Sequence, residues 1–479
     1  MVGVTHALGS SMTLAIRRRT RENNVMRPTS ISKVSTVVAL LLSSFAASGA
    51  SEYLFKNGQL ITMASPEPIH ADLLVRDGRI RTIGRDLSVN IDSRVIDMRG
   101  GYLMPGLAEM HAHVPAPNSG QQYRDDVLFL WIAHGITTVR GMLGHPDHLI
   151  LKQALMNDEV LGPRLITSGP SFNGNSVSSP EQARAMVRAQ KTAGYDFLKI
   201  HPGLTLAEYD AMAQEAELQG IGFAGHVPAA VGLLHTLELR QRTIDHLDGY
   251  IAAMVVAPDA HGERARAGFG VGLTPYVDNT RLTDLVRVTH RAGVWIVPTQ
   301  TLLENSSSGE TAEDLISRPQ NVYLPRTVLA NFSRRAHNAI SNDDLGLEFL
   351  ALRSRIIKAL HDGGVGILLG SDSPQYFNVP GASIHRELES MVAAGLTPFE
   401  ALATGTTNPA RFFDLEEEFG QLRPGLAADL VLLSKNPLQN ITNSTTIEGV
   451  MIRGRWMDKR MREAGLADIA RRNGGSLAK

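Results

Sequence analysis

The stretch LMPGLAEMHAHV, residues 103–114, is an apolar segment that closes with His111 and His113. It predicts a β-strand. Because side chains alternate between the two faces of a strand, both imidazoles are expected on the same face. Two imidazoles on one face suit a metal ion, although a His-x-His pair alone is as often partly exposed or hydrogen-bonded within the protein.

Further strand-like segments follow, separated by helical stretches such as 180–193, 206–219 and 345–362. These segments span 135–142, 164–172, 196–202, 222–228, 243–250, 294–300 and 366–372. With the first strand they make eight strand-then-helix units, which predict a (β/α)8 TIM barrel with its chemistry at the C-terminal ends of the strands. The alternative is a doubly wound open sheet, but no Gly-rich phosphate loop follows the first strand.

Short alternating stretches between residues 51 and 104 are separated by turn sequences such as Asn57-Gly58 and Asp77-Gly78. They predict a small β module. Similar stretches at 429–433 and 447–452 suggest that the two ends pair into one sheet. The predicted organisation is a signal segment 1–50, a discontinuous β-sandwich domain 51–104 and 416–460, a barrel 105–415 and a C-terminal tail 461–479.

The composition favours a globular protein with a small-molecule substrate. The chain has 479 residues and is 43% hydrophobic, which is enough for a large core. Its 47 basic and 48 acidic residues give a net charge of -1, so no global field attracts nucleic acid or an anionic membrane. Because there is no cysteine, disulfides, thiolate catalysis and Cys-ligated metals are excluded.

Three more potential metal ligands fall at later strand ends. His226 lies in GFAGHVP, His246 in TIDHL and Asp372 in ILLGSDS. Four imidazoles and a carboxylate that converge on one barrel mouth form a metal site far more often than they pack without a function. The sequence therefore predicts that these side chains meet His111 and His113.

Lys199 is a charged residue in the apolar strand DFLKI. Its alternation places Phe197, Lys199 and His201 on one side of the strand. An ammonium group that points into a barrel is costly unless it is paired or chemically altered. One solution is a carbamate, formed when a neutral amine captures carbon dioxide, whose oxygens bridge two cations. The alternative is a salt bridge to a buried carboxylate.

These motifs together resemble the amidohydrolase superfamily, and within it the imidazolonepropionase-like and Xaa-Pro dipeptidase-like branch. The resemblance covers about residues 52–458. It rests on PGL at 105–107, HAH at 111–113, FLKI at 197–200, GHV at 225–227, DH at 245–246, GSD at 370–372, NPA at 408–410 and RPGLAADLV at 423–431. Two departures are Glu109 and Gly141, where aspartate is common in the family.

The resemblance implies two divalent cations, with zinc as the default metal. His111, His113 and Asp372 would hold the more buried cation, His226 and His246 would hold the other, and carboxylated Lys199 would bridge them. Such a pair lowers the pKa of a bound water. Asp372 would accept the proton of this water and pass it to the leaving nitrogen.

The expected reaction is hydrolysis of a carbon–nitrogen amide bond in a small peptide-like or N-acyl amino acid substrate. The pocket walls would come from loops 171–179, 250–272 and 302–342, which can also act as lids or as contacts of a homo-oligomer. Plausible substrate contacts, each with an equally good packing role, are His201, Tyr250, Tyr276, Arg140 and His385.

Other functions remain open at this point. The same dinuclear centre could act as a lactonase or a phosphotriesterase, and a one-metal version could hydrolyse a cyclic amide or act as a deaminase. Lys199 argues against the one-metal versions. From a different class, the protein could be an exported, non-catalytic binding module, although intact ligands at all predicted positions argue against it.

The N-terminus predicts export. Lys33 precedes the uncharged stretch 34–47, and Ser48, Gly49 and Ala50 then offer a signal-peptidase site. The stretch is shorter than the roughly 20 residues that span a bilayer, so stable membrane insertion is not expected. Met26 is an alternative start, and a membrane-anchored or disordered tail is the alternative interpretation. The expected location is periplasmic or secreted.

Overall fold

The computed structural model describes residues 52–262, 268–337 and 343–474, which belong to one compact unit, Gly49–Lys479. The predicted signal segment 1–50 lies outside the described residues. Among the helices of the described ranges, none combines the length and the apolar character needed to cross a bilayer.

Two sheets combine the N-terminal strands with strands from the C-terminal part of the chain. The first has the order β5-β4-β1-β6 and the second the order β17-β16-β15-β7-β2-β3. Their strands are β1 (Glu52–Lys56), β2 (Gln59–Leu60), β3 (Ile69–His70), β4 (Asp72–Arg76), β5 (Arg79–Gly84), β6 (Arg94–Asp97), β7 (Tyr102–Pro105), β15 (Leu430–Leu433), β16 (Ile447–Ile452) and β17 (Arg455–Asp458).

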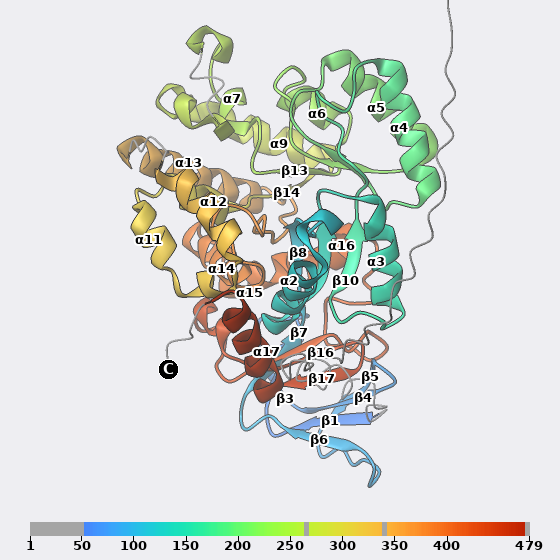
Figure 1. Ribbon diagram of the computed structural model, residues 1–479. Helices are drawn as coiled ribbons and strands as arrows, with labels where there is room; N and C mark the ends of the chain where they lie inside the picture. Colours follow the sequence, from blue (N-terminus) through green and yellow to red (C-terminus); the bar gives the residue numbers. More distant parts are fainter. Residues whose placement is uncertain (1–51, 263–267, 338–342, 475–479) are drawn as a thin grey trace, which may run out of the picture. The chain divides into compact units, whose positions relative to one another are not determined.

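The two ends of the chain meet where β7 pairs antiparallel with β15. Leu103 lies opposite Leu432, and Met104 lies opposite Val431. In Figure 1 the blue N-terminal strands accordingly lie beside the red C-terminal strands. This pairing agrees with the prediction that both ends contribute to one sheet.

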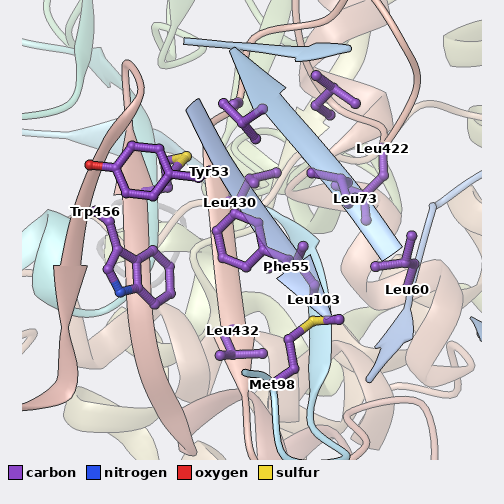
Figure 2. Close-up of a cluster of buried hydrophobic side chains, with 14 residues drawn as sticks. Tyr53, Phe55, Leu60, Leu73, Met98, Leu103, Leu422, Leu430, Leu432 and Trp456 are labelled. Atoms are coloured by element: carbon purple, nitrogen blue, oxygen red, sulfur yellow. The ribbon is translucent and has the colours of Figure 1, made fainter. Parts of the chain in front are cut away.

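One hydrophobic core joins these two sheets (Figure 2). The ring of Phe55 on β1 meets the ring of Trp456 on β17 edge to face, with centroids 5.3 Å apart. Alternate residues of a strand point to one face, so β1, β4 and β15 each contribute every second side chain to this core. The other large members include Tyr53, Leu60, Leu73, Met98, Leu103, Leu422, Leu430, Leu432 and Met451.

The middle of the chain alternates short parallel strands with helices. These strands form a sheet of order β10-β9-β8 and a sheet of order β11-β12-β13-β14. They are β8 (Leu107–Ala112), β9 (Ile136–Gly141), β10 (Arg164–Thr167), β11 (Leu198–Ile200), β12 (Phe223–Gly225), β13 (Thr243–Asp245) and β14 (Trp295–Val297). Parallel bridges between Ser168 and Phe197 and between Phe172 and Ile200 connect the two sheets.

The predicted eighth strand, 366–372, is not a regular strand. It makes one parallel bridge from Ile367 to Ile296 and is followed by another from Ser373 to Ala112. The amide of Leu369 donates to the Thr404 carbonyl at 2.9 Å and so leaves the ladder, which explains the irregularity. The segment nevertheless runs between β14 and β8.

Helices cover the parallel strands, and their ends follow local sequence signals. Ser179 caps α4, whereas Thr205 and Glu208 form a capping box for α5. Gly194 and Gly220 end these helices in the left-handed conformation. The predicted helices 180–193, 206–219 and 345–362 are therefore confirmed. Between residues 52 and 292, the α-helices that the structure describes are α2 (Gln121–Ala133), α3 (Pro146–Met156), α4 (Pro180–Ala193), α5 (Leu206–Gln219), α6 (Leu233–Glu238), α7 (Tyr250–Ala253) and α9 (Leu282–Ala292).

Two segments that the sequence presented as a loop and a tail contain helices. The loop 302–342 contains most of α10 (Gln300–Ser307), α11 (Ala312–Ser317) and α12 (Arg326–His337). The predicted tail is largely α17 (Lys459–Arg472), whose Leu466 and Ile469 pack against Leu130 of α2. The remaining helices are α13 (Asp343–Asp362), α14 (Ala382–Ala393), α15 (Pro398–Thr404) and α16 (Thr407–Phe412).

Candidate metal centre

Two histidines at the end of β8 face the carboxylate of Asp372. The Nε2 atom of His113 lies 2.7 Å from Asp372 Oδ1, and the Nε2 atom of His111 lies 3.6 Å from the same oxygen. All six residues of β8 are buried, and His111 is 1% exposed. The amide of Asp372 donates to the His111 carbonyl at 2.9 Å, which fixes the carboxylate beside the strand end.

The histidines after β12 and β13 join the same group. The ring of His246 lies 4.6 Å from the ring of His111 and 4.5 Å from the ring of His226, measured between centroids. The Nδ1 atom of His246 bonds to Thr299 Oγ1 and that of His226 to Asp248 Oδ2, both at 2.7 Å. These bonds orient both rings and leave Nε2 as the ligand atom, as is usual for metal-binding histidines.

Lys199 of β11 is fully buried and lies close to Asp245 of β13. Its Nζ atom is 3.7 Å from Asp245 Oδ2, and His111 Nδ1 is 3.0 Å from the same oxygen. On its other side Asp245 contacts Arg140, whose Nη2 atom lies 3.4 Å from Oδ1. In the sequence, Asp245 stands out only as part of the DH motif at 245–246. Alternation along β13 places it on the same side as Thr243, and this signal could have identified it.

Burial and like charges favour neutral side chains in this group. Burial and the nearby Lys199 lower the pKa of His111 well below its usual range. Burial and the ring of His226 do the same for the pKa of His246. Burial also lowers the pKa of Lys199, although Asp245 opposes the shift. Neutral imidazoles and a neutral amine are the forms that can bind a metal or capture carbon dioxide.

Several buried polar atoms of this group have no hydrogen-bond partner among the described residues, even where an oppositely charged atom is close. Buried polar groups are otherwise almost always bonded, so each orphan needs an explanation. Three side chains, His111, His246 and Asp372, have ligand atoms within 4.8 Å of one another. Nitrogen and carboxylate donors in this arrangement fit a divalent metal. The unbonded atoms are His111 Nδ1, His113 Nδ1, Lys199 Nζ, His201 Nδ1, Asp245 Oδ2 and Asp372 Oδ1.

Buried side chains that the sequence analysis did not assign brace the strand ends. Glu109 accepts hydrogen bonds from the amide and the hydroxyl of Ser371, at 2.7 and 2.6 Å. Arg353 of α13 donates to the carbonyls of His246 and Pro298, both at 2.7 Å. Both contacts join residues far apart in the sequence, so no local sequence pattern predicts them.

The structure gives packing contacts to three of the predicted substrate-binding residues. Arg140 is 1% exposed and donates to the Met110 carbonyl. The hydroxyl of Tyr250 bonds to Thr289 Oγ1 at 2.7 Å, and Nδ1 of His385 bonds to Ser444 Oγ at 2.9 Å. All three side chains are buried, and the burial of a polar group is costly unless it is hydrogen-bonded. These partners therefore stabilise the buried positions. Each thus makes the packing contacts that were its alternative role, and substrate binding by these three residues stays a prediction.

Two other predicted contacts lie nearer to solvent. The ring of His201 stacks on that of His226, with centroids 5.1 Å apart. His201 therefore lies with His111, His113, His226 and His246, which together form the histidine group. The ring of Tyr276 stacks on His261, with centroids 4.0 Å apart, and Tyr276 is 38% exposed. Substrate contact by both residues stays a prediction.

Comparison with known proteins identifies the class of protein that this fold and site define. Residues 102–457 match the amidohydrolase family, and the chain belongs to that family. This confirms the resemblance recognised in the sequence and makes the protein a hydrolase. The family has a TIM barrel with an additional domain and generally binds divalent metals, in agreement with the mixed α/β structure and the group of His111, His246 and Asp372.

Individual relatives are distant. Adenine deaminase 3 of Rhizobium meliloti (strain 1021) is 23% identical over 429 residues, which cover 85% of this chain and 58% of that protein. The chain thus spans less than two thirds of the deaminase. Among solved structures, a bottromycin amidohydrolase has a TM-score of 0.71 at 21% identity, covering 92% of this chain and 94% of that chain. A Xaa-Pro dipeptidase has a TM-score of 0.63 at 18% identity, covering 85% and 100%. These two likenesses concern the fold.

Proposed function

We propose that the protein is a dinuclear metal-dependent amidohydrolase that cleaves the carbon–nitrogen bond of a small peptide-like or N-acyl amino acid substrate. The proposed scaffold is a closed (β/α)8 barrel, in which 366–372 is the eighth strand between β14 and β8. The bridges of Ile367 to Ile296 and of Ser373 to Ala112 support this closure. The observation that carries the function is the convergence of buried, unbonded nitrogen and oxygen atoms at the ends of these strands.

The proposed ligands divide into two sets. His111, His113 and Asp372 would hold one cation, His226 and His246 would hold the other, and a carbamate on Lys199 would be a ligand shared by both. When bound, two such cations make water nucleophilic near neutral pH and polarise the substrate carbonyl. Zinc is the proposed metal because the donors are neutral imidazoles and carboxylates.

Asp372 is the proposed catalytic acid–base residue. Its Oδ1 atom lies 2.7 Å from His113 Nε2 and faces the histidine group, so it can accept a proton there and deliver it to the leaving nitrogen. Asp248 and Thr299 hold the rings of His226 and His246 in one orientation. This fixed geometry avoids reorganisation during the reaction.

A one-metal hydrolase is the second candidate, and the proximity of Lys199 to Asp245 favours it. The distance of 3.7 Å between Nζ and Oδ2 fits the salt bridge that the sequence left as the alternative to a carbamate. In that case Lys199 would neutralise Asp245, and the cation would be held by His111, His246 and Asp372.

Metal content and carbon-13 NMR distinguish these candidates. The dinuclear enzyme is expected to hold about two metals per chain and to show a carbamate signal after exchange with labelled bicarbonate. Lys199→Ala should lose the bound metal and the carbamate signal, and acetate or propionate should partly restore its activity. His337→Gln, a change at an exposed position on α12, is the control. One metal per chain without a carbamate signal supports the mononuclear candidate.

The hydrolase activity itself is tested with a panel of dipeptides and N-acyl amino acids. We expect turnover that a chelator abolishes and that added zinc restores. Absence of turnover across the panel in metal-loaded protein contradicts the proposed reaction. Turnover of lactones or phosphotriesters in its place would favour those alternatives, and binding without turnover would indicate a binding module.

We also propose that the protein is exported to the periplasm or secreted, on the basis of the N-terminal sequence. Expression of the full chain followed by cell fractionation and N-terminal sequencing tests this. A mature N-terminus near residue 51 is expected. Recovery of the uncleaved chain in the cytoplasm contradicts export.

A further inference from the structure

A large cavity opens beside the histidine group. Its volume is about 1270 Å³, and its wall includes His226 and Asp248 together with segments after β12 and β13. Much of the wall is apolar. The apolar side chains that the argument uses are Leu233, Leu234, Ile251, Val256, Phe269 and Leu273.

Phe269 connects the cavity to the histidine group. Its ring lies 5.5 Å from the ring of His246, in an edge-to-face arrangement. Phe269 and Gly270 both have left-handed backbones, with φ of 58° and 84°, and the turn they make interrupts the 3-10 helix η3 (Gly268–Tyr276). An L-residue rarely adopts this conformation, so the surrounding structure must hold Phe269 there.

Apolar side chains at the rim remain in contact with water. Val256 is 70% exposed, Leu234 is 55% exposed and Phe269 is 37% exposed, although all three belong to the wall of the same cavity. Deeper in the wall, Leu273 is fully buried. Grouped apolar surface around a cavity marks a site for an apolar ligand, because covering this surface is favourable.

Two basic side chains in the wall, His235 and Arg281, make contacts within the protein. His235 Nε2 lies 2.6 Å from Asp210 Oδ1, and its Nδ1 lies 3.3 Å from Glu238 Oε2. Arg281 donates to the Val255 carbonyl at 2.9 Å. A bridge between Val255 and Val277 further fixes this wall. Because much of the remaining wall is apolar, the ligand that fits it presents apolar surface.

We propose that this cavity is a specificity pocket that receives an apolar chain attached next to the scissile amide bond. The inference rests on the proposed hydrolase function, whose reacting atoms lie by His226 and His246. The volume exceeds that of most small-molecule pockets, so a chain of several carbon atoms fits. The apolar chain belongs either to the acyl group or to the amino acid side chain of the substrate.

Two substrate series test the pocket and distinguish these sources. One lengthens the acyl group of N-acylglycine from acetyl to decanoyl, and the other enlarges the side chain of N-acetyl amino acids from glycine to phenylalanine. We expect kcat/KM to rise by about fourfold per methylene in one series, which corresponds to burial of one methylene group. A flat response in both series overturns the proposal.

Variants at the exposed rim localise the effect. Leu234→Arg and Val256→Arg should each reduce the preference for the longest over the shortest substrate by at least about tenfold, because a charge enters the apolar wall. Leu218→Arg is the matched control, since Leu218 is an exposed leucine (78%) on α5 outside the cavity. An equal loss of preference in the control contradicts the assignment.

A binding measurement separates failure of the pocket from failure of the proposed reaction. Calorimetric titration of Asp372→Asn with N-octanoylglycine and N-acetylglycine should show tighter binding of the octanoyl compound, and Leu234→Arg should reduce the difference. Tighter binding without turnover in the native protein supports the pocket and contradicts the hydrolysis. Turnover with equal binding of both compounds contradicts the pocket alone.

Discussion

Buried carboxylates in two regions of the molecule differ in their hydrogen bonds. Glu387 of α14 accepts hydrogen bonds from the amides of Gln300 and Thr301, both at 2.8 Å. At the ends of β8 and β13, by contrast, Asp372 Oδ1 and Asp245 Oδ2 have no hydrogen-bond donor within the described part of the chain. Burial of a carboxylate is costly unless it is paired. Both oxygens of Glu387 are therefore hydrogen-bonded, whereas Asp245 faces Lys199 and Arg140, and Asp372 faces His113, without a hydrogen bond from a described residue to these two oxygens.

The largest expected effect comes from changing an unbonded carboxylate. Asp372→Asn should lower kcat by about 10² to 10⁴-fold, because the amide cannot take up the proton. Kinetics on the best amide substrate measure the loss, and circular dichroism checks the fold. Asp284→Asn, an exposed position (76%) on α9, is the control. Turnover near that of the native protein in Asp372→Asn would rule out the acid–base role.

The hydrogen-bonded carboxylate of Glu387 should make the free energy of unfolding depend on pH. Burial raises the pKa of Glu387 from 4.5 to about 7. Between these values the unfolded chain releases a proton that the folded protein retains, so the free energy of unfolding falls as pH rises from 4.5 to 7. The decline amounts to about 3 kcal/mol.

Glu387→Gln should remove this decline, since the amide stays neutral at every pH. Urea unfolding at several pH values between 4 and 8 measures it. The matched control is Glu417→Gln, at a position whose side chain is 83% exposed. If the native protein and Glu387→Gln show the same slope, the buried carboxyl group is not the source.

A smaller effect is expected where a hydrogen bond orients a ligand. Asp248→Asn should weaken metal affinity by about 10 to 100-fold, because a neutral amide is a weaker acceptor for the His226 ring than a carboxylate. Competition with a chromogenic chelator measures the affinity, and Asp362→Asn on α13 is the control, with a half-exposed side chain (54%). Unchanged affinity would place His226 outside the metal centre.

The smallest effect comes from a hydrogen-bonded helix cap that is not part of the candidate metal centre. Ser179 caps α4 by accepting a hydrogen bond from the Gln182 amide at 3.2 Å. Ser179→Ala should cost about 1 kcal/mol of stability and leave metal content and turnover unchanged. Thermal unfolding followed by metal analysis checks both. Loss of metal in this variant would contradict the prediction that the cap of α4 affects stability alone.

Much of the fold could be predicted because its signals are local. The helices 180–193 and 206–219 carry their own caps, and a short apolar segment marks β8. The eighth strand was less successful, since Leu369 directs its amide to Thr404, which is remote in the sequence. The helix α17 was missed because it is stabilised by packing against α2.

The candidate site was predicted in part. The structure brings His111, His113, Lys199, His226, His246 and Asp372 together, as their positions at strand ends suggested. Sequence reasoning could not foresee that Arg140 would bond to Asp245 and Met110, or that His385 would bond to Ser444. A polar side chain in an apolar segment signals burial, but not the identity of its partner.

The amino-acid sequence by itself determined the class of fold and the chemical types of the candidate ligands, because hydrophobic period, caps and residue identity are properties of neighbouring positions. Only the tertiary structure decided which buried atoms lack a hydrogen bond and which apolar side chains surround a cavity beside His226. Hydrogen bonding and packing depend on distances between segments far apart in the chain, and no local pattern fixes those distances.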